Sequence, residues 1–170
     1  WIAVLLLGGG IALDQTLTGV VTRNFDAQLS SMLNGMIGSA EVGLDGEVFL
    51  NRPLGDQRLL EPNSGLYWQI RGQGHEDFAS RSLWDRSLDV QTGHLDKDAH
   101  TYESHQFPGE TLRVMERSAT LPGSDTVWWF SVAQRKSDLG EQVARVRRIL
   151  VRSFAVLGLG LLVMAALQTW

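Results

Sequence analysis

The C-terminal residues 136–170 constrain the fold of this chain more than any other stretch. They include no Pro, so nothing obvious interrupts a single helix. The first half carries apolar residues at the 4-3-4 spacing of a helix–helix seam, namely Leu139, Val143, Val146 and Leu150. From Ser153 onward there is no charge, which is typical of a membrane-spanning segment. We therefore predict a juxtamembrane signalling helix that continues into a second transmembrane helix, together covering residues 139–170.

The N-terminal residues form another apolar stretch. Residues 1–13 are apolar but too few to span a bilayer alone. A secretory signal peptide is disfavoured, because no small-residue cleavage site follows and helical periodicity continues from Leu13 to Ile37. We predict a first transmembrane helix over residues 1–22, truncated at its start, followed by an amphipathic helix over residues 23–40.

The middle of the chain is rich in strand signals. Residues 40–51 read as two short strands around Asp45-Gly46, a dipeptide typical of β-hairpin turns. Further strands are expected at residues 66–71, 80–84, 111–121 and 126–134, whereas residues 85–110 show no clear period. Successive antiparallel strands between two helices predict an α+β fold.

Charge and composition narrow the function. The chain has a formal net charge of −4 and no Cys, which excludes a disulfide framework and a thiolate-ligated metal site. Acidic side chains dominate residues 24–134, whereas the flanks are basic. This distribution suits a domain above anionic membrane lipid and argues against a nucleic-acid partner. The short motifs of catalytic sites are also missing, so we expect no catalytic residues in this segment.

All four His residues fall between His75 and His105, in a stretch that is also rich in carboxylates. Imidazole and carboxylate side chains together can hold a divalent cation, and imidazoles can also report pH. The candidate metal ligands are His94, His100, His105, Asp96 and Asp98. The alternative is a solvated loop, because the spacings between these His residues match no zinc motif.

Aromatic side chains on the predicted strands are candidates for a ligand pocket. The candidate ligand-binding residues are Tyr67, Trp68, Trp84 and Trp128. The alternative is that they form the core of a small sheet. Because neighbours on a strand face opposite sides, one indole of Trp128 and Trp129 should lie away from the main packing face.

Several segments carry a family resemblance. They are Arg23-Asn24-Phe25-Asp26, Pro53-Leu54-Gly55-Asp56, residues 62–70 (PNSGLYWQI), residues 80–85 (SRSLWD), residues 121–125 (LPGSD) and Leu167-Gln168. With them, the chain resembles the extracytoplasmic sensor region, with flanking transmembrane helices, of a bacterial two-component sensor histidine kinase.

This resemblance implies a PAS-like sensor domain over residues 23–138 in the periplasm, anchored in the bacterial inner membrane. Its antiparallel sheet would have five or six strands packed against long N- and C-terminal helices that continue into the membrane. The resemblance also implies a homodimer through the membrane-proximal helices. A cytoplasmic protein-histidine kinase part, not contained in these residues, would receive the stimulus and act on a response regulator.

A second function class stays open at this point. The chain could instead be a ligand-binding or structural membrane-anchored module of a non-kinase receptor or envelope complex. Both classes leave the stimulus unnamed, because the resemblance rests on turns and core aromatics.

Overall fold

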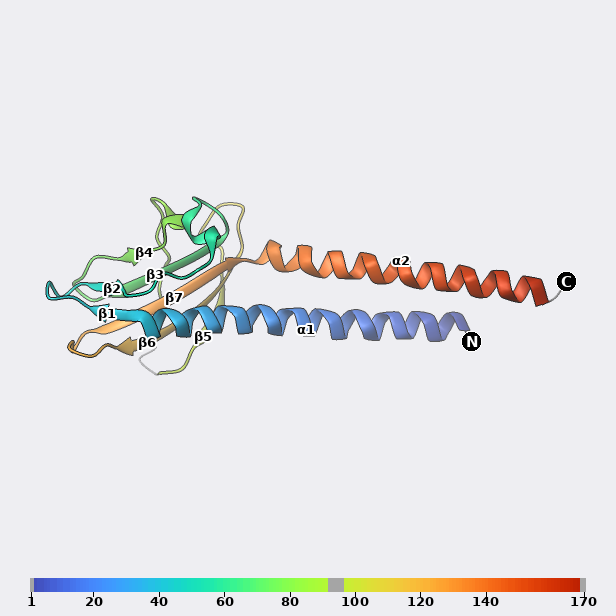
Figure 1. Cartoon of the computed structure of the whole chain (residues 1–170), viewed down its shortest axis with the longest axis horizontal. Coiled ribbons are helices and arrows are strands. Elements are labelled where there is room, and N and C mark those ends of the chain that lie inside the picture. Colours follow the sequence, from blue (N-terminus) through green and yellow to red (C-terminus); the bar gives the residue numbers. More distant parts are fainter. Residues whose placement is uncertain (1, 92–96, 169–170) are drawn as a thin grey trace. The chain divides into compact units, whose positions relative to one another are not determined.

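The computed structural model describes residues 2–91 and 97–168 (Figure 1). Its elements, in chain order, are α1 (Ile2–Ser39), β1 (Ala40–Val42), β2 (Val48–Leu50), the 3₁₀ helix η1 (Gln57–Leu60), β3 (Leu66–Gly72), β4 (Phe78–Ala79), the 3₁₀ helix η2 (Arg81–Leu83), β5 (His100–Ser104), β6 (Leu112–Thr120), β7 (Val127–Arg135) and α2 (Lys136–Gln168). The chain divides into two compact units. One comprises Asn24–Ser137, and the other is the helical unit formed by the residues up to Arg23 and from Asp138 onward.

The unit Asn24–Ser137 is built around a five-stranded antiparallel sheet in the order β4-β3-β7-β6-β5. The last strand in the sequence, β7, therefore lies at the centre and pairs with β3 on one side and β6 on the other. A separate two-stranded sheet joins β1 to β2 across the turn at Asp45-Gly46, where Gly46 has a positive φ. The α+β class and the long helices at both ends agree with the sequence-based prediction.

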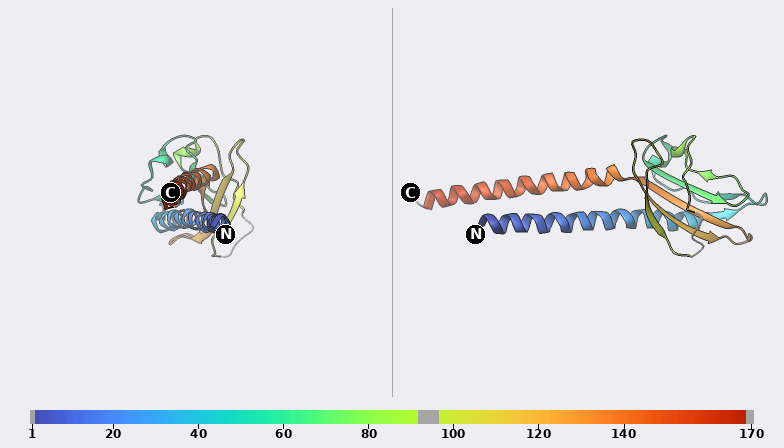
Figure 2. Two further views of the ribbon diagram at one scale, coloured as in Figure 1. Left: turned by 90° about the vertical axis from the view of Figure 1, so that its right-hand side faces the viewer. Right: turned by 180° about the vertical axis from the view of Figure 1, so that it is seen from behind.

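The C-terminal part of α1, residues 24–39, covers one face of the sheet. Its buried side chains recur at helical spacing and comprise Phe25, Leu29, Leu33 and Met36. Arg113 on β6 pairs with Asp26, with nitrogen–oxygen distances of 2.5 and 2.8 Å, and Arg117 donates to Asn34 at 3.3 Å. The helix lies in front of the strands in Figure 1 and behind them in the right-hand view of Figure 2.

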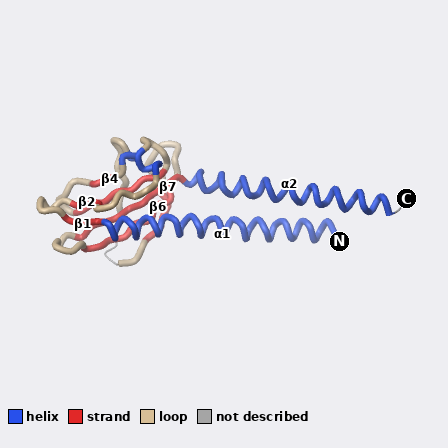
Figure 3. Tube along the Cα trace, in the orientation of Figure 1, coloured by secondary structure: helices blue, strands red, loops and turns tan. Residues whose placement is uncertain are grey.

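The opposite face carries a second apolar cluster. Its buried members are Tyr67, Leu83, Leu88, Phe107, Leu112, Val114 and Ala133. They come from β3, β6 and β7, from the 3₁₀ helix η2 and from the loops drawn tan above the sheet in Figure 3. The sheet thus has a helix on one face and mostly irregular structure on the other.

The structure differs from the predicted strands at residues 80–84 and in the two edge strands β4 and β5, which were not predicted. Residues 80–84 contain η2 (Arg81–Leu83) rather than a strand, because the Ser80 and Ser82 hydroxyls form hydrogen bonds with the backbone of β3. Ser80 Oγ accepts from Trp68 N at 3.1 Å, and Ser82 Oγ donates to Leu66 O at 2.6 Å. The edge strand β5 gave no alternating apolar pattern, since Tyr102 is the one aromatic among otherwise polar side chains.

The two predicted transmembrane helices are not supported. Across residues 2–91 and 97–168, no helix has a stretch long and apolar enough to cross a membrane. A spanning helix needs about 20 consecutive apolar residues. In α1 the apolar start is followed by Asp14, and in α2 the uncharged residues begin after Arg152. Within the helical unit, Asp14 lies 3.4 Å from Arg147.

Candidate functional site

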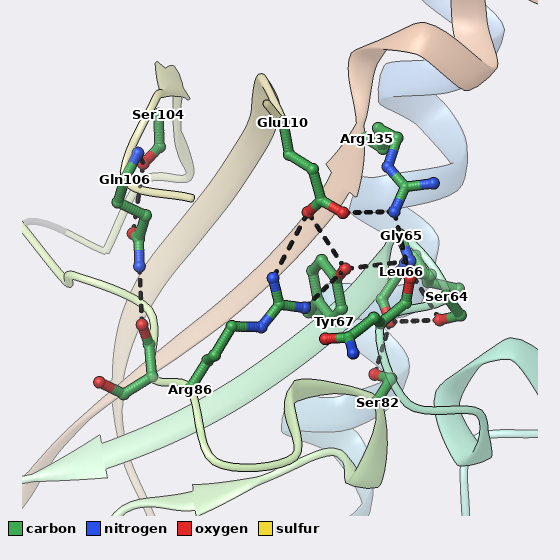
Figure 4. Close-up of polar contacts among 12 residues, drawn as sticks. Ser64, Gly65, Leu66, Tyr67, Ser82, Arg86, Ser104, Gln106, Glu110 and Arg135 are labelled. Carbon is green, nitrogen blue, oxygen red and sulfur yellow. Dashed lines mark hydrogen bonds and ion pairs between the residues drawn. The ribbon is translucent and has the colours of Figure 1, made fainter. Parts of the chain in front are cut away.

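Four side chains converge where the sheet meets α2, and we call them the Glu110 cluster: Tyr67, Arg86, Glu110 and Arg135 (Figure 4). The Tyr67 hydroxyl donates to Glu110 Oε2 at 3.2 Å and accepts from Arg86 Nη2 at 2.9 Å. Arg86 Nη1 lies 3.7 Å from Glu110 Oε2, and Arg135 Nη2 forms an ion pair with Glu110 Oε1. One carboxylate thus joins two guanidinium groups and a phenol.

The Glu110 cluster is largely shielded from water. The side chain of Glu110 is 15% exposed, and those of Arg86 and Arg135 are 25% and 29% exposed. The Arg86 guanidinium also stacks over Phe107 and Tyr67, at 4.1 and 5.0 Å from the ring centroids. Removing the single carboxylate would leave two cations facing each other. Their repulsion would be costly, because water screens these charges only partly.

The Glu110 cluster holds the point where β7 becomes α2. Arg135 is the last residue of β7, and Lys136 is the first of α2. Lys136 N donates to Thr111 O at 2.8 Å, and Lys136 Nζ lies 2.7 Å from Glu103 on β5. The hydrogen bond from Lys136 lowers the pKa of the Glu103 carboxyl. The start of α2 is therefore tied to β5, to the loop before β6 and, through Arg135, to β3.

Buried polar residues also occupy the centre of the face opposite α1. Gln69 is fully buried, accepts from Leu88 N at 2.7 Å and donates to Leu88 O at 3.2 Å. Glu116 is 2% exposed and accepts from the Tyr102 hydroxyl at 2.9 Å. Burial, and then the Glu116 carboxylate, raises the pKa of Tyr102. Two residues along β7 from Trp129, the buried Ser131 hydroxyl has no hydrogen-bond partner among the described residues.

The four predicted ligand-binding residues do not meet in one pocket. Tyr67 belongs to the Glu110 cluster, whereas Trp68 lies on the other face against Phe78, with ring centroids 5.1 Å apart. Trp84 is 65% exposed and has a positive φ of 58°. Trp128 is fully buried beside His75, at 4.7 Å between ring centroids. The indole on the opposite face from Trp128 is Trp129, as the alternation predicts.

The metal hypothesis stays a prediction. His94 and Asp96 lie outside the described residues. Asp98, His100 and His105 are described, and His100 opens β5 opposite Glu116. Among the residues that the structure describes, no three His, Asp or Glu side chains are grouped to hold a metal ion.

The sequence did not place Arg86, Glu110 and Arg135 in one site. Glu110 falls in the stretch without a period, and its partners Tyr67 and Arg86 lie far from it in the sequence. No local spacing signals such a group. The one available hint was Tyr67, which was singled out as an aromatic and is used through its hydroxyl.

Comparison with known proteins gives one result. Residues 2–145 match the protein family described as Two-component sensor kinase N-terminal. Searches of curated proteins and of solved structures found no match.

Proposed function

The chain belongs to the two-component sensor kinase N-terminal family and is the N-terminal sensor region of such a kinase, and we propose that it passes an extracytoplasmic stimulus to a cytoplasmic kinase part through α1 and α2. The kinase part would lie beyond the sequence in hand. The arrangement of one helix on one face of a five-stranded antiparallel sheet supports assigning the sensor domain to the PAS-like folds.

One observation carries this proposal: the central strand β7 continues into α2 at the next residue. A shift of β3, β5 or β6 against β7 would act directly on Arg135 and Lys136, because these residues bond to Gly65, Thr111, Glu103 and Glu110. Small displacements at a sensing site are amplified when they select between two packings of helices. The state of the sheet would select one of two helix packings, and α2 would transmit that change to the kinase part.

The proposed location is the periplasmic side of a bacterial inner membrane. It rests on family membership and on the acidic centre and basic flanks of the chain, which suit contact with anionic lipid. A reporter enzyme that needs periplasmic disulfides, fused after Asp138, should be active. If a reporter that is active only in the cytoplasm is active when fused at the same position, and the periplasmic reporter is not, this location is contradicted.

The proposed partners are a second copy of the chain and a cytoplasmic response regulator. The copies would meet along the α2 seam that includes Val143 and Val146. Because the chain has no Cys, a single introduced thiol gives a clean cross-linking readout. Val146→Cys should form disulfide-linked dimers, whereas Arg145→Cys should form fewer, and equal cross-linking at both positions would refute the seam.

The signalling proposal can be tested without knowing the stimulus. Glu110→Gln serves as the input, because it removes the charge that holds Arg135, and autophosphorylation of the complete kinase is the output. We expect Glu110→Gln to change basal autophosphorylation. Val146→Pro in α2 should abolish that change, since Pro in a helix interior costs about 3 kcal/mol or more. Val146→Ala is the matched control and should preserve it.

Two results would refute the mechanism. One is a complete kinase whose basal activity does not respond to Glu110→Gln. The other is an equal response in the Val146→Pro and Val146→Ala backgrounds, which would mean that the signal does not need a continuous α2.

A further inference from the structure

A cavity of about 620 Å³ lies at the turn between β3 and β4, away from the Glu110 cluster. It is lined by Arg71, Gly72, Gln73, Gly74, His75, Asp77 and Trp129. Its volume falls in the range of small-molecule sites, about 300–1,000 Å³. None of these residues contributes to the junction between β7 and α2.

The wall of this cavity carries one cation and one anion side by side. Arg71 Nε lies 2.8 Å from Asp77 Oδ1, and Arg71 Nη2 lies 2.5 Å from Asp77 Oδ2. Their side chains are 32% and 33% exposed, so both remain within reach of a ligand. Gln69 Nε2 holds Asp77 Oδ2 from the sheet side at 3.3 Å. The charges of Arg71 and Asp77 cancel. A ligand with only one charge would pair with one of these side chains and leave the other without an ionic partner.

Beside this pair, the lining includes one indole with an unused donor, that of Trp129. Trp129 is 9% exposed, and its Nε1–H donates to no acceptor among the described residues. Buried indole N–H groups normally find a partner. Trp128 on the same strand cannot play this part, because its ring packs over Gly72 on the other face. Trp129 therefore borders the cavity with a buried, unsatisfied donor, and it lies directly opposite Arg71 in the pairing of β3 with β7.

We propose that this cavity binds a zwitterionic small molecule, namely a free α-amino acid with an apolar side chain. The ligand carboxylate pairs with Arg71 and supplies an acceptor for Trp129, while the ligand ammonium pairs with Asp77. The apolar side chain packs on the indole. The ligand replaces the Arg71–Asp77 pair with two new ion pairs, so the net charge of the site is unchanged. The site rests on the proposed function only in that its ligand would be a stimulus.

Calorimetric titration of the 170-residue chain tests the proposal, with L-phenylalanine as the probe. Phenethylamine lacks the carboxylate, and 3-phenylpropionate lacks the ammonium group. We expect L-phenylalanine to bind and each analogue to bind at least about 10-fold more weakly, since each loses one charged pair. No heat with L-phenylalanine, or equal affinity for all three compounds, would overturn the proposal.

Variants assign the binding to this cavity. Arg71→Gln should abolish binding, and Trp129→Phe, which keeps the apolar wall but removes the N–H, should weaken it several-fold. Glu76→Gln is the matched control, since Glu76 lies on the same turn, is exposed and does not line the cavity. Retained affinity in both Arg71→Gln and Trp129→Phe would overturn the site. Because this assay needs no kinase, binding without any change in autophosphorylation would keep the site and remove its role as the stimulus site.

Discussion

Replacing Glu110 with Gln tests whether the Glu110 cluster stabilises the sensor domain through charge. The substitution keeps the size of the side chain and one acceptor oxygen but removes the negative charge. Arg86 and Arg135 then lose their shared ionic partner, and the Tyr67 hydroxyl loses a charged acceptor. The two guanidinium groups stay in place, so the variant has uncompensated positive charge at the start of α2.

The burial of the cluster sets the size of the effect. Breaking a fully buried ion pair costs about 3–5 kcal/mol, whereas a surface pair contributes about 0–1 kcal/mol. Glu110 is 15% exposed and its partners are 25% and 29% exposed, which places the cluster between these limits. We expect a loss of about 2 kcal/mol in the free energy of unfolding. For a domain of this size, that loss lowers the thermal midpoint by roughly 8 °C.

Urea unfolding of the 170-residue chain is the direct assay. The fluorescence of the buried Trp128 and Trp129 monitors the transition. A loss of about 2 kcal/mol lowers the urea midpoint by about 1 M. Glu103→Gln is the matched control, because Glu103 pairs with the neighbouring Lys136 but both side chains are well exposed. Its midpoint should stay that of the parent chain.

Equal midpoints for Glu110→Gln and the parent chain would refute the assignment of stability to this cluster. Equal losses for Glu110→Gln and Glu103→Gln would show that burial does not set the effect. Adding Arg86→Met to Glu110→Gln should recover part of the loss, since it removes one unpaired cation.

Three further predictions concern the packing of the sheet and of α1, and each is measured by urea unfolding. Gly72→Ala should cost about 1–3 kcal/mol, because its Cβ would lie 2.5 Å from the Trp128 ring, and an unchanged midpoint would contradict that contact. Leu33→Ala should cost about 3 kcal/mol, since Leu33 is 1% exposed on the side of α1 that packs on the sheet; a loss below about 1 kcal/mol would contradict its place in the core. Tyr102→Phe should be less stable than the parent at pH 7 by about 1 kcal/mol. The pKa of Tyr102 is raised in the fold, so its contribution is complete below the usual pKa of about 10 and falls as the pH rises above it. The gap should therefore narrow by pH 11, and a gap independent of pH would contradict the raised pKa of Tyr102.

The sequence predicted the parts of the fold whose signals are local. The alternation in residues 111–121 and 126–134 anticipated β6 and β7 to within a residue or so, and Asp45-Gly46 anticipated the hairpin of β1 and β2. These elements owe their form to patterns of apolar side chains and turn residues that a short window contains. The strand β5 gave no such pattern, because Tyr102 is the one aromatic among otherwise polar side chains.

The Glu110 cluster could not be predicted from the sequence, for a different reason. Tyr67 was identified for its ring, but its partner Glu110 is 43 residues away. The strand prediction at residues 80–84 failed because Ser80 and Ser82 bond to the backbone of β3, a contact that exists only in the folded chain. Alternation did predict that Trp128 and Trp129 face opposite sides, but not that Trp129 would border the cavity.

The position of β7 has a consequence for how the domain comes into being. The central strand of the sheet is the last one to be synthesised, and β3 and β6 are joined to each other through it. Until Arg135 has emerged, the nascent chain holds separate strand pairs with open edges, which are open to wrong pairings. Such late, long-range closure predicts slow folding and a need for protection of the growing chain. The sheet is completed just as the first turn of α2 is made, so assembly of the sensor and exit of its output helix coincide in time.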